Sequence, residues 1–308
     1  MTLLPLPPEA PALFRDLAVE PEEARSILRP QKDERYGFGF ALSPYRGCGH
    51  GCRYCYVREY PNALHGADEW GRWTAPKVNA PELLWAQRHR LHGARVFMAS
   101  ATDPYQPLER ELRLSRRCLE VLLRCPTTEV IVHTRSPLVL QDLDLLRAFG
   151  DRLRVGFSVP TDDDTVRQVV EPAAPPIPSR WAALERLSAA GIATAVGVAP
   201  LLPVQDAAAF ARRARASGAR SAWVGRLRLL DRDPFYRVLA DHGWLQALDP
   251  DHAAQVRAAF EAAFPEPSRS RRARTPRRAP PGSPAPAPAA HQPSLFGAAV
   301  PCGRLDRP

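Results

Sequence analysis

The chain has 308 residues, 45% of them hydrophobic, which is enough for one large domain with extensions or for two ordinary domains. It has no run of about 18 apolar residues and no basic leader followed by an apolar block, so we expect no membrane span, no secretory signal, and a cytoplasmic protein with reduced thiols. Its net charge is +9, and residues 265–308 contribute +6 of it, because they contain eight arginines and two acidic residues.

Residues 1–35 are rich in proline at first and then show a short helical pattern at 21–28, so we interpret them as an N-terminal extension. From residue 36 to about 230, short apolar segments typical of buried strands alternate with longer segments that have the pattern of helices. The predicted strands cover residues 38–43, 95–100, 129–134, 153–158, 193–199 and 221–225. The predicted helices cover residues 81–91, 108–123, 138–150, 179–191 and 206–218, and several end in glycine, as helices often do.

This alternation predicts an α/β fold in which a parallel sheet is covered by helices. Six strand–helix units are too few for an eightfold barrel, so we predict an open, partial (β/α)6 barrel with its chemistry at the carboxyl ends of the strands. The core would span residues 36–230, followed by a C-terminal helical segment at 231–264. The tail at 265–308 is rich in proline, alanine and arginine, and we predict that it is disordered because it has almost nothing to bury.

Three of the six cysteines lie within eight residues, in the segment SPYRGCGHGCRYCY at 43–56, directly after the first predicted strand. Their spacing, C-x3-C-x2-C, places three thiols on one loop, and thiolate is the ligand that iron–sulfur clusters use. Glycines between the cysteines let the backbone wrap closely around a ligand. Cys48, Cys52 and Cys55 would leave one iron of a four-iron cluster open, and an open coordination position is typical of catalytic metal sites.

Two other interpretations of these cysteines are a zinc site and a ferredoxin-type cluster. A zinc site usually needs a fourth ligand, and His50 lies inside the loop, where it is poorly placed to reach the same metal. A ferredoxin-type cluster needs four cysteines, but Cys118, Cys125 and Cys302 lie in predicted helices or in the tail. The open cluster is therefore the favoured interpretation.

With the aromatic residue Tyr54 before the third cysteine, this motif resembles that of the radical S-adenosylmethionine (SAM) superfamily. The resemblance implies that Cys48, Cys52 and Cys55 bind a [4Fe-4S] cluster and that SAM chelates the fourth iron. It also implies that the reduced cluster cleaves SAM to methionine and a 5′-deoxyadenosyl radical, which abstracts hydrogen from a substrate. Tyr54 would lie near the adenine of SAM.

Further segments resemble the spore photoproduct lyase-like branch of this superfamily. They are TDPYQPLE (102–109), HTRSP (133–137), VEP (170–172) and GVAPLLP (197–203), and the resemblance covers roughly residues 22–225. It implies that Thr102 and Asp103 lie where the family contacts the SAM amino group. Arg135 stands where the branch commonly has a lysine directed at the SAM carboxylate, and Ser158 matches a serine that hydrogen-bonds SAM.

One departure from the branch concerns the final hydrogen donor. Spore photoproduct lyases carry a cysteine at the end of the second strand, which returns a hydrogen atom to the product radical. This sequence reads MASATD there, with Ser100 near that position. Because the O–H bond of serine is too strong for that role, the departure puts the lyase mechanism of thymine-dimer repair in question.

The tail suggests partners in DNA metabolism. Arg-rich segments are often solvated and nonspecific, but several arginines on a flexible arm would bind the phosphates of DNA or RNA with a strong dependence on salt. Within the tail, QPSLF at Gln292–Phe296 resembles the peptide with which bacterial repair and replication proteins dock on the sliding clamp, although proline stands where leucine is preferred.

The leading hypothesis from the sequence is a radical SAM enzyme that acts on nucleic acid and is related to DNA-lesion repair. An electron donor is then an expected partner, because the cluster must be reduced. One alternative is a radical SAM enzyme that modifies a protein, a peptide or a small molecule. Another is a non-catalytic iron–sulfur adaptor.

Overall fold

The computed structural model describes residues 17–31, 37–59, 65–98, 101–229 and 233–265. Ser100, Cys302, the tail arginines and the segment Gln292–Phe296 lie outside the described residues, so the predictions for them stay predictions. None of the helices in the described part of the chain has the length and apolar character that crossing a membrane requires.

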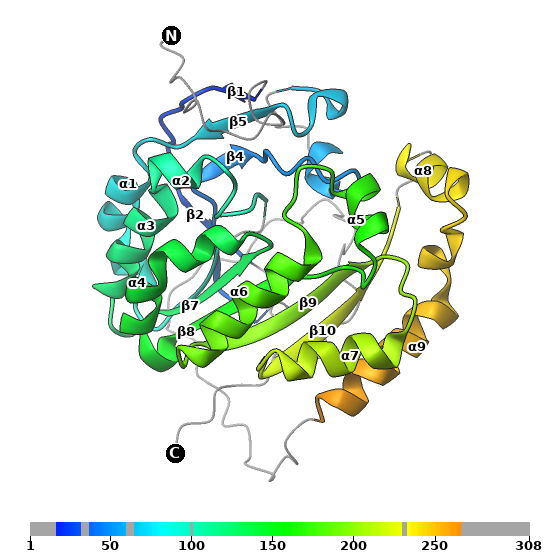
Figure 1. Cartoon of the computed structure of the whole chain (residues 1–308). Helices are drawn as coiled ribbons and strands as arrows, with labels where there is room; N and C mark the ends of the chain where they lie inside the picture. Colours follow the sequence, from blue (N-terminus) through cyan, green and yellow to red (C-terminus); the bar gives the residue numbers. More distant parts are fainter. Residues whose placement is uncertain (1–16, 32–36, 60–64, 99–100, 230–232, 266–308) are drawn as a thin grey trace, which may run out of the picture.

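A large sheet runs through the molecule (Figure 1). In spatial order its strands are β10 (Ser221–Arg226), β9 (Ala193–Leu201), β8 (Leu153–Ser158), β7 (Glu129–Thr134), β6 (Arg95–Met98), β3 (Phe40–Leu42) and β2 (Leu28–Pro30). Neighbours from β10 to β3 pair in parallel, and β2 pairs with β3 antiparallel. The parallel strands follow the chain order expected for an open (β/α)6 barrel, which confirms the predicted α/β fold.

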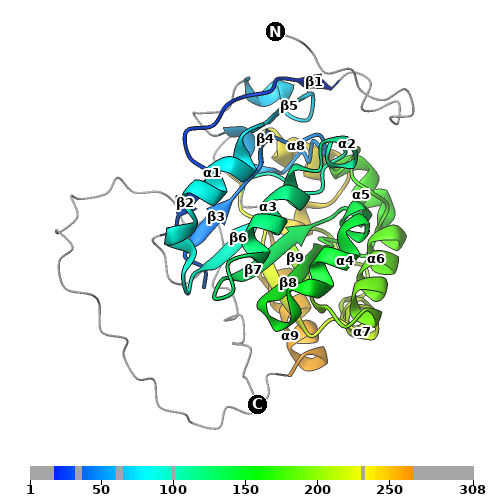
Figure 2. The same cartoon turned by 90° about the vertical axis from the view of Figure 1, so that its left-hand side faces the viewer.

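A smaller sheet lies at one end of the molecule, beyond the large sheet (Figures 1 and 2). Its strands, in spatial order, are β1 (Ala18–Val19), β5 (Trp73–Pro76) and β4 (Tyr45–Gly47). This sheet was not predictable from the sequence, because its strands are two to four residues long, too short for a recognisable period. β4 leads directly into the cysteine segment, so the small sheet forms one side of the candidate site.

Helices lie between the parallel strands along the chain and cover one face of the large sheet (Figure 2). They are α1 (Ala80–Ala86), α2 (Glu109–Leu112), α3 (Leu114–Leu123), α4 (Leu143–Ala148), α5 (Asp164–Val170), α6 (Ile177–Ala189) and α7 (Ala207–Ala216). Two more, α8 (Phe235–Asp241) and α9 (Pro250–Ala263), follow the last strand, β10. Strand β7 shows why the helices pack on this face. Its residues Val130 and Val132 point to one face and are buried, whereas Ile131 and His133 point to the other face and are half-buried. Leu119 and Leu122 of α3 are fully buried in the same core.

The ends of several helices are set by their own residues. Asp163, Asp206 and Asp249 cap the N-termini of α5, α7 and α9, each accepting a hydrogen bond from a backbone N–H of the first turn. Gly191 and Gly218 follow α6 and α7 with φ of 82° and 83°. These glycines confirm the predicted ends of the two helices, since a left-handed residue at this place is available to glycine at little cost.

The helix predicted at residues 21–28 is wrong. This segment is extended, and the backbone N–H of Glu22 donates to the carbonyl oxygen of Pro76 beside the small sheet (2.9 Å). At its end, the fully buried Leu28 begins β2 of the large sheet. Pairing with neighbouring strands and burial of apolar side chains outweigh the weak local preference for a helix.

The helix predicted over residues 108–123 is broken at Arg113, whose φ is 53°, into α2 and α3. One oxygen of the Glu109 carboxylate accepts a hydrogen bond from the backbone N–H of Ser115 (2.8 Å) and so caps the first turn of α3. The other oxygen accepts a hydrogen bond from the hydroxyl of Tyr45 in β4. Burial raises the pKa of Glu109 to about 8. The break thus turns a carboxyl group inward, beneath the cysteine segment.

One helix was not predicted: the chain forms α5 between β8 and α6. α8 and α9 fall in residues 231–264, which we interpreted as helical. α9 packs against α7, with the rings of Phe260 and Phe210 5.2 Å apart, whereas α8 lies at the same end of the molecule as the small sheet (Figures 1 and 2).

Candidate active site

The cysteine loop, residues 48–55, begins directly after β4. Cys48 and Cys52 are buried and Cys55 is half-buried. Burial raises the pKa of all three thiols, that of Cys55 to about 11, so each thiol is protonated near neutral pH unless a cation stabilises its thiolate. Binding of a metal cluster in this loop would therefore release protons and convert the thiols into thiolate ligands.

A tight turn brings the first two cysteines together. The backbone N–H of Gly51, whose φ is 56°, donates to the carbonyl oxygen of Cys48 at 3.2 Å. A Cβ atom at Gly51 would lie 3.1 Å from the Cα of Gly71 in the neighbouring segment. Both the backbone conformation and this close approach require glycine at position 51.

The cysteine loop does not gather ligands around a single ion. Across the ranges that the structure describes, no three His, Cys, Asp or Glu side chains form a group that could hold one metal ion. His50 is buried, with Nε2 3.6 Å from the Asp103 carboxylate and Nδ1 3.4 Å from the carbonyl oxygen of Ala173. Burial lowers the pKa of His50. Three separate thiols suit a cluster, in which each binds its own iron, better than zinc, on which four ligands converge.

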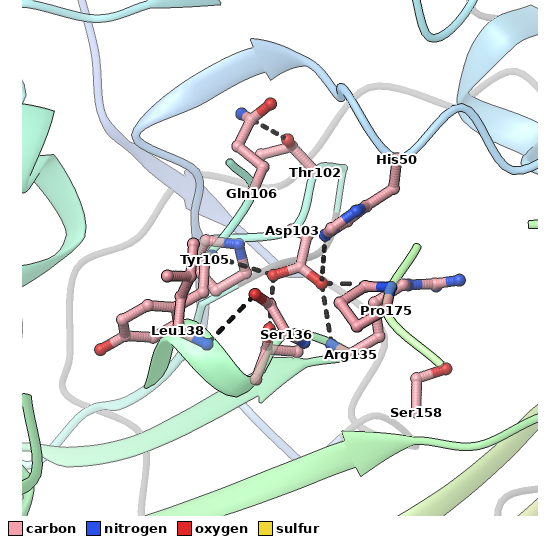
Figure 3. A network of polar contacts seen from close by, with 12 residues as sticks. His50, Thr102, Asp103, Tyr105, Gln106, Arg135, Ser136, Leu138, Ser158 and Pro175 are labelled. Atoms are coloured by element: carbon pink, nitrogen blue, oxygen red, sulfur yellow. Dashed lines mark hydrogen bonds and ion pairs between the residues drawn. The ribbon is translucent and has the colours of Figure 1, made fainter. Parts of the chain in front are cut away.

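The segment that begins at Thr102 makes hydrogen bonds to the backbone around Cys48, and Figure 3 shows two of its side chains, Thr102 and Gln106, in contact. The hydroxyl of Thr102 donates to the carbonyl oxygen of Gly47 at 2.6 Å. The side-chain oxygen of Gln106 accepts a hydrogen bond from the backbone N–H of Gly49 at 3.0 Å, and its amide donates to the Thr102 hydroxyl at 3.4 Å. Two side chains that follow β6 therefore hold the backbone on both sides of Cys48.

Asp103 lies at the centre of a buried polar network (Figure 3). One carboxylate oxygen accepts hydrogen bonds from the Thr134 hydroxyl (2.5 Å) and from the backbone N–H of Tyr105 (2.9 Å). The other accepts from the backbone N–H of Arg135 at 2.8 Å and faces His50. Asp103 thus ties the segment after β6 to the end of β7 and to the cysteine loop.

Arg135, which follows β7, reaches from this network to the cysteine loop. Its Nη1 donates to Cys52 Sγ at 2.9 Å, to the hydroxyl of Tyr54 at 2.8 Å, and to a carboxylate oxygen of Glu171. The Tyr54 hydroxyl also donates to that Glu171 oxygen, and the ring of Tyr54 packs edge-on against Phe235 of α8 at 5.9 Å. These contacts join two predicted SAM-binding residues, Arg135 and Tyr54, to a cysteine of the loop.

Glu171 and Arg180 complete this network from the segment after β8. Both side chains are fully buried, and Arg180 Nη2 lies 2.5 Å from the second carboxylate oxygen of Glu171. Burial alone would raise the pKa of Glu171, but the charges of Arg180 and Arg135 hold it at about 2. The sequence pattern gave no role to Glu171, in the segment VEP, or to Arg180, because no local pattern shows that the end of α5 and helix α6 bring these residues to Arg135.

Ser158, the last residue of β8, differs from the other predicted SAM contacts. Thr102, Asp103 and Arg135 already use their side chains in contacts within the protein, whereas the buried Ser158 hydroxyl has no hydrogen-bond partner among the described residues. A buried polar atom without a partner costs stability unless a ligand satisfies it. This hydroxyl, beside a loop of three thiols, fits a site that holds a cluster together with a polar ligand such as SAM.

Aromatic rings line the face of the large sheet opposite the helices. His133 lies between Phe97 and Trp223, with ring centroids 6.1 and 5.1 Å away. Glycines make room for these rings, since a Cβ at Gly156 would lie 2.6 Å from His133 Nδ1 and one at Gly197 would lie 2.4 Å from the Trp223 ring. Burial lowers the pKa of His133 to about 4, so the ring is neutral near pH 7. Glycines inside two predicted strands were the sequence signal for this close packing.

A protein-family model described as the radical SAM superfamily matches residues 42–215, which is more than half of the chain. The matched range contains the three cysteines of the loop and each predicted SAM contact. The part of the chain that matches the family therefore includes the cysteine loop and the polar network around it.

Curated relatives come from archaea, an archaeal virus and mycobacteria, and all are named as uncharacterised proteins. A Methanocaldococcus jannaschii protein is 29% identical over 59% of this chain and 66% of its own length. A protein of Acidianus two-tailed virus is 32% identical over 54% of this chain and 56% of its own. A Mycobacterium tuberculosis protein is 30% identical over 54% of this chain and 50% of its own. The chain thus spans about half to two thirds of the length of these relatives.

Solved structures of spore photoproduct lyase mutants share the fold. One, with bound AdoMet and dinucleoside spore photoproduct, has a TM-score of 0.59 and 15% sequence identity, and the match covers 84% of both chains. Another, with dinucleoside spore photoproduct, has a TM-score of 0.58 and 15% identity, with 80% of both chains covered. At 15% sequence identity, the similarity to these structures shows a shared fold and nothing further.

Proposed function

Because the chain belongs to the radical SAM superfamily, we propose that it is an enzyme that holds a [4Fe-4S] cluster on Cys48, Cys52 and Cys55 and cleaves SAM reductively. The observation that supports this proposal is the cysteine loop directly after β4, in which three thiols share eight residues and two of them, Cys48 and Cys52, are buried. When bound and reduced, the cluster would supply the electron that splits SAM into methionine and a 5′-deoxyadenosyl radical.

The chain's own residues would then hold the loop and receive SAM. Thr102 and Gln106 keep the loop backbone in place, and the unpartnered hydroxyl of Ser158 offers a hydrogen bond to bound SAM. Tyr54, next to Cys55 and packed on α8, would cover the adenine. Burial of Cys48 and Cys52 would keep water away from the part of the cluster that they bind.

The substrate that we propose is a nucleic acid, DNA or RNA. Half-buried rings of Phe97, His133 and Trp223 lie on the face of the sheet opposite the helices, and bases stack on aromatic rings. The arginines of the tail would bind phosphates and bring the strand to this face. The spore photoproduct lyase structures with a bound dinucleoside lesion share this fold, which supports the same class of substrate.

The cofactor proposal is tested on anaerobically reconstituted protein. Iron and sulfide content and 5′-deoxyadenosine formation from SAM with dithionite are measured for the wild type, Cys52→Ala and Cys125→Ala. We expect a full cluster and turnover in the wild type and in Cys125→Ala, because Cys125 lies outside the loop, and loss of both in Cys52→Ala. Zinc-loaded protein without turnover would reject the proposal, and a full cluster without 5′-deoxyadenosine would indicate an adaptor.

The substrate proposal is tested by binding of single-stranded DNA and RNA at several salt concentrations. Trp223→Ala should weaken binding roughly tenfold or more, since stacking of one base contributes about 1–3 kcal/mol. Trp85→Ala is the matched control, because Trp85 is an exposed tryptophan on α1 of the helix-covered face. Equal binding by the two variants, or transfer of deuterium from labelled peptide into 5′-deoxyadenosine, would favour a different substrate.

A further inference from the structure

Arg135 donates directly to the sulfur of a proposed cluster ligand. Its Nη1 lies 2.9 Å from Cys52 Sγ, and the arginine side chain is only 17% exposed. The resemblance to the lyase-like branch implied that a cation at this position addresses the carboxylate of SAM. In this structure the guanidinium instead reaches the cysteine loop itself.

The position of Arg135 is held at both ends. Its backbone N–H donates to Asp103, and its guanidinium pairs with the fully buried carboxylate of Glu171. Glu171 is held in turn by Arg180, whose guanidinium donates to the carbonyl oxygens of Ser158 (3.1 Å) and Pro175 (2.8 Å). Because the same Nη1 also pairs with this buried carboxylate, the ion pair restrains the Arg135 guanidinium next to Cys52.

The charges around Cys52 are paired. Arg135 and Arg180 share the carboxylate of Glu171, and Arg135 Nε also lies 3.9 Å from the carboxylate of Asp103, so two carboxylates balance the two arginines. The effect of Arg135 on Cys52 therefore comes from the direct N–H to sulfur contact, which is stronger at this place than in solvent because Glu171 and Arg180 are fully buried.

We propose that Arg135 tunes the cluster through Cys52, raising its reduction potential before SAM binds. The inference rests on the proposed function, in which Cys52 is a cluster ligand. Accepting one electron from an external donor makes the cluster more negative. A hydrogen bond from a cation to a ligand sulfur stabilises that reduced form more than the oxidised one. Arg135 is thus a positioning residue for the redox step, with Glu171 and Arg180 as its supports.

The test is an anaerobic redox titration of the reconstituted full chain, followed by electron paramagnetic resonance, without SAM and then with it. Arg135→Met should lower the midpoint potential in the absence of SAM. Arg135→Lys keeps the buried charge opposite Glu171 but lacks the forked guanidinium that contacts Cys52 and Glu171 together, so its potential should lie between those of the wild type and Arg135→Met. If Arg135→Met does not fold, the difference in potential between Arg135→Lys and the wild type tests the proposal.

The matched control is Arg213→Met, which removes the same charge from α7, where Arg213 pairs with Glu185 at the surface. Its potential should equal that of the wild type. The inference is overturned if Arg135→Lys and wild type have the same potential without SAM and differ only in SAM affinity. Wild-type protein that binds no cluster would instead reject the proposed function, and iron and sulfide content separates the two cases.

Discussion

Ser158 is the predicted SAM contact whose side chain has no partner among the described residues. Ser158→Ala should therefore leave the stability of the protein nearly unchanged. The same substitution should weaken SAM binding roughly tenfold, because one hydrogen bond contributes about 1 kcal/mol or somewhat more. Equilibrium binding of SAM to cluster-loaded protein measures the effect.

Ser179→Ala is the control for this experiment, since the exposed Ser179 hydroxyl bonds within its own helix turn. Unchanged SAM affinity in Ser158→Ala would show that the hydroxyl faces no ligand. A large loss of stability would show that it has a partner within the protein.

Glu171 gives the stability a defined pH dependence. Its pKa is held at about 2, below the ordinary 4.5, so its ionised form stabilises the fold above about pH 4.5, and this stabilisation is lost as the pH falls toward 2. Glu171→Gln should lower the free energy of unfolding by about 3 kcal/mol at pH 7, and the difference from wild type should shrink at pH 3.5. Urea unfolding of the cluster-free protein at both pH values measures this.

Glu185→Gln is the comparison for Glu171→Gln, because Glu185 pairs with Arg213 at the surface and such pairs contribute about 1 kcal/mol or less. If Glu171→Gln is as stable as Glu185→Gln at pH 7, the ion pairs of Glu171 with Arg135 and Arg180 stabilise the fold no more than a surface pair does, which contradicts the prediction.

The cysteine loop depends, as an element, on glycine at position 51. Gly51→Ala places a side chain at φ 56° and within 3.1 Å of the Gly71 backbone, so we expect a displaced loop and less iron bound per chain. Gly150→Ala is a matched control, because Gly150 has the same φ of 56° but no neighbour within 4 Å of an added Cβ. Iron and sulfide content after reconstitution distinguishes the two variants.

Both substitutions should cost about 1 kcal/mol through the backbone conformation alone. Gly150→Ala should nevertheless retain a full cluster. If Gly51→Ala binds as much iron as Gly150→Ala, the close approach to Gly71 is not needed for the loop.

The elements that were predicted correctly from the sequence are long enough to show a regular hydrophobic period. Strand β7 and helix α3 show alternating and helical burial patterns that the sequence already displays. The segment at 21–28 and the break at Arg113 were not predictable in this way. In the first, strand pairing outweighs local propensity, and in the second the distant hydroxyl of Tyr45 and a capping carboxylate, Glu109, set the conformation.

Binding of nucleic acid is expected to depend on the whole chain. If residues 266–308 supply phosphate contacts, their removal should weaken DNA and RNA binding and reduce the dependence of affinity on salt. Replacement of the tail arginines by glutamine at unchanged length is the matched comparison. Unaltered affinity and salt dependence in both variants would leave the sheet face as the binding surface and assign the tail no role in it.

The sequence by itself determined where the candidate site lies and which chemistry we propose for it, because three cysteines on one loop are a local feature that needs no knowledge of the fold. It also determined the α/β architecture, because apolar period and turn residues are local as well. Only the tertiary structure decided how the site is held. Glu171, after α5, and Arg180, in α6, contact Arg135, which follows β7 and contacts Cys52 of the cysteine loop. Such pairing of buried charges from distant parts of the chain produces no periodic pattern in the sequence.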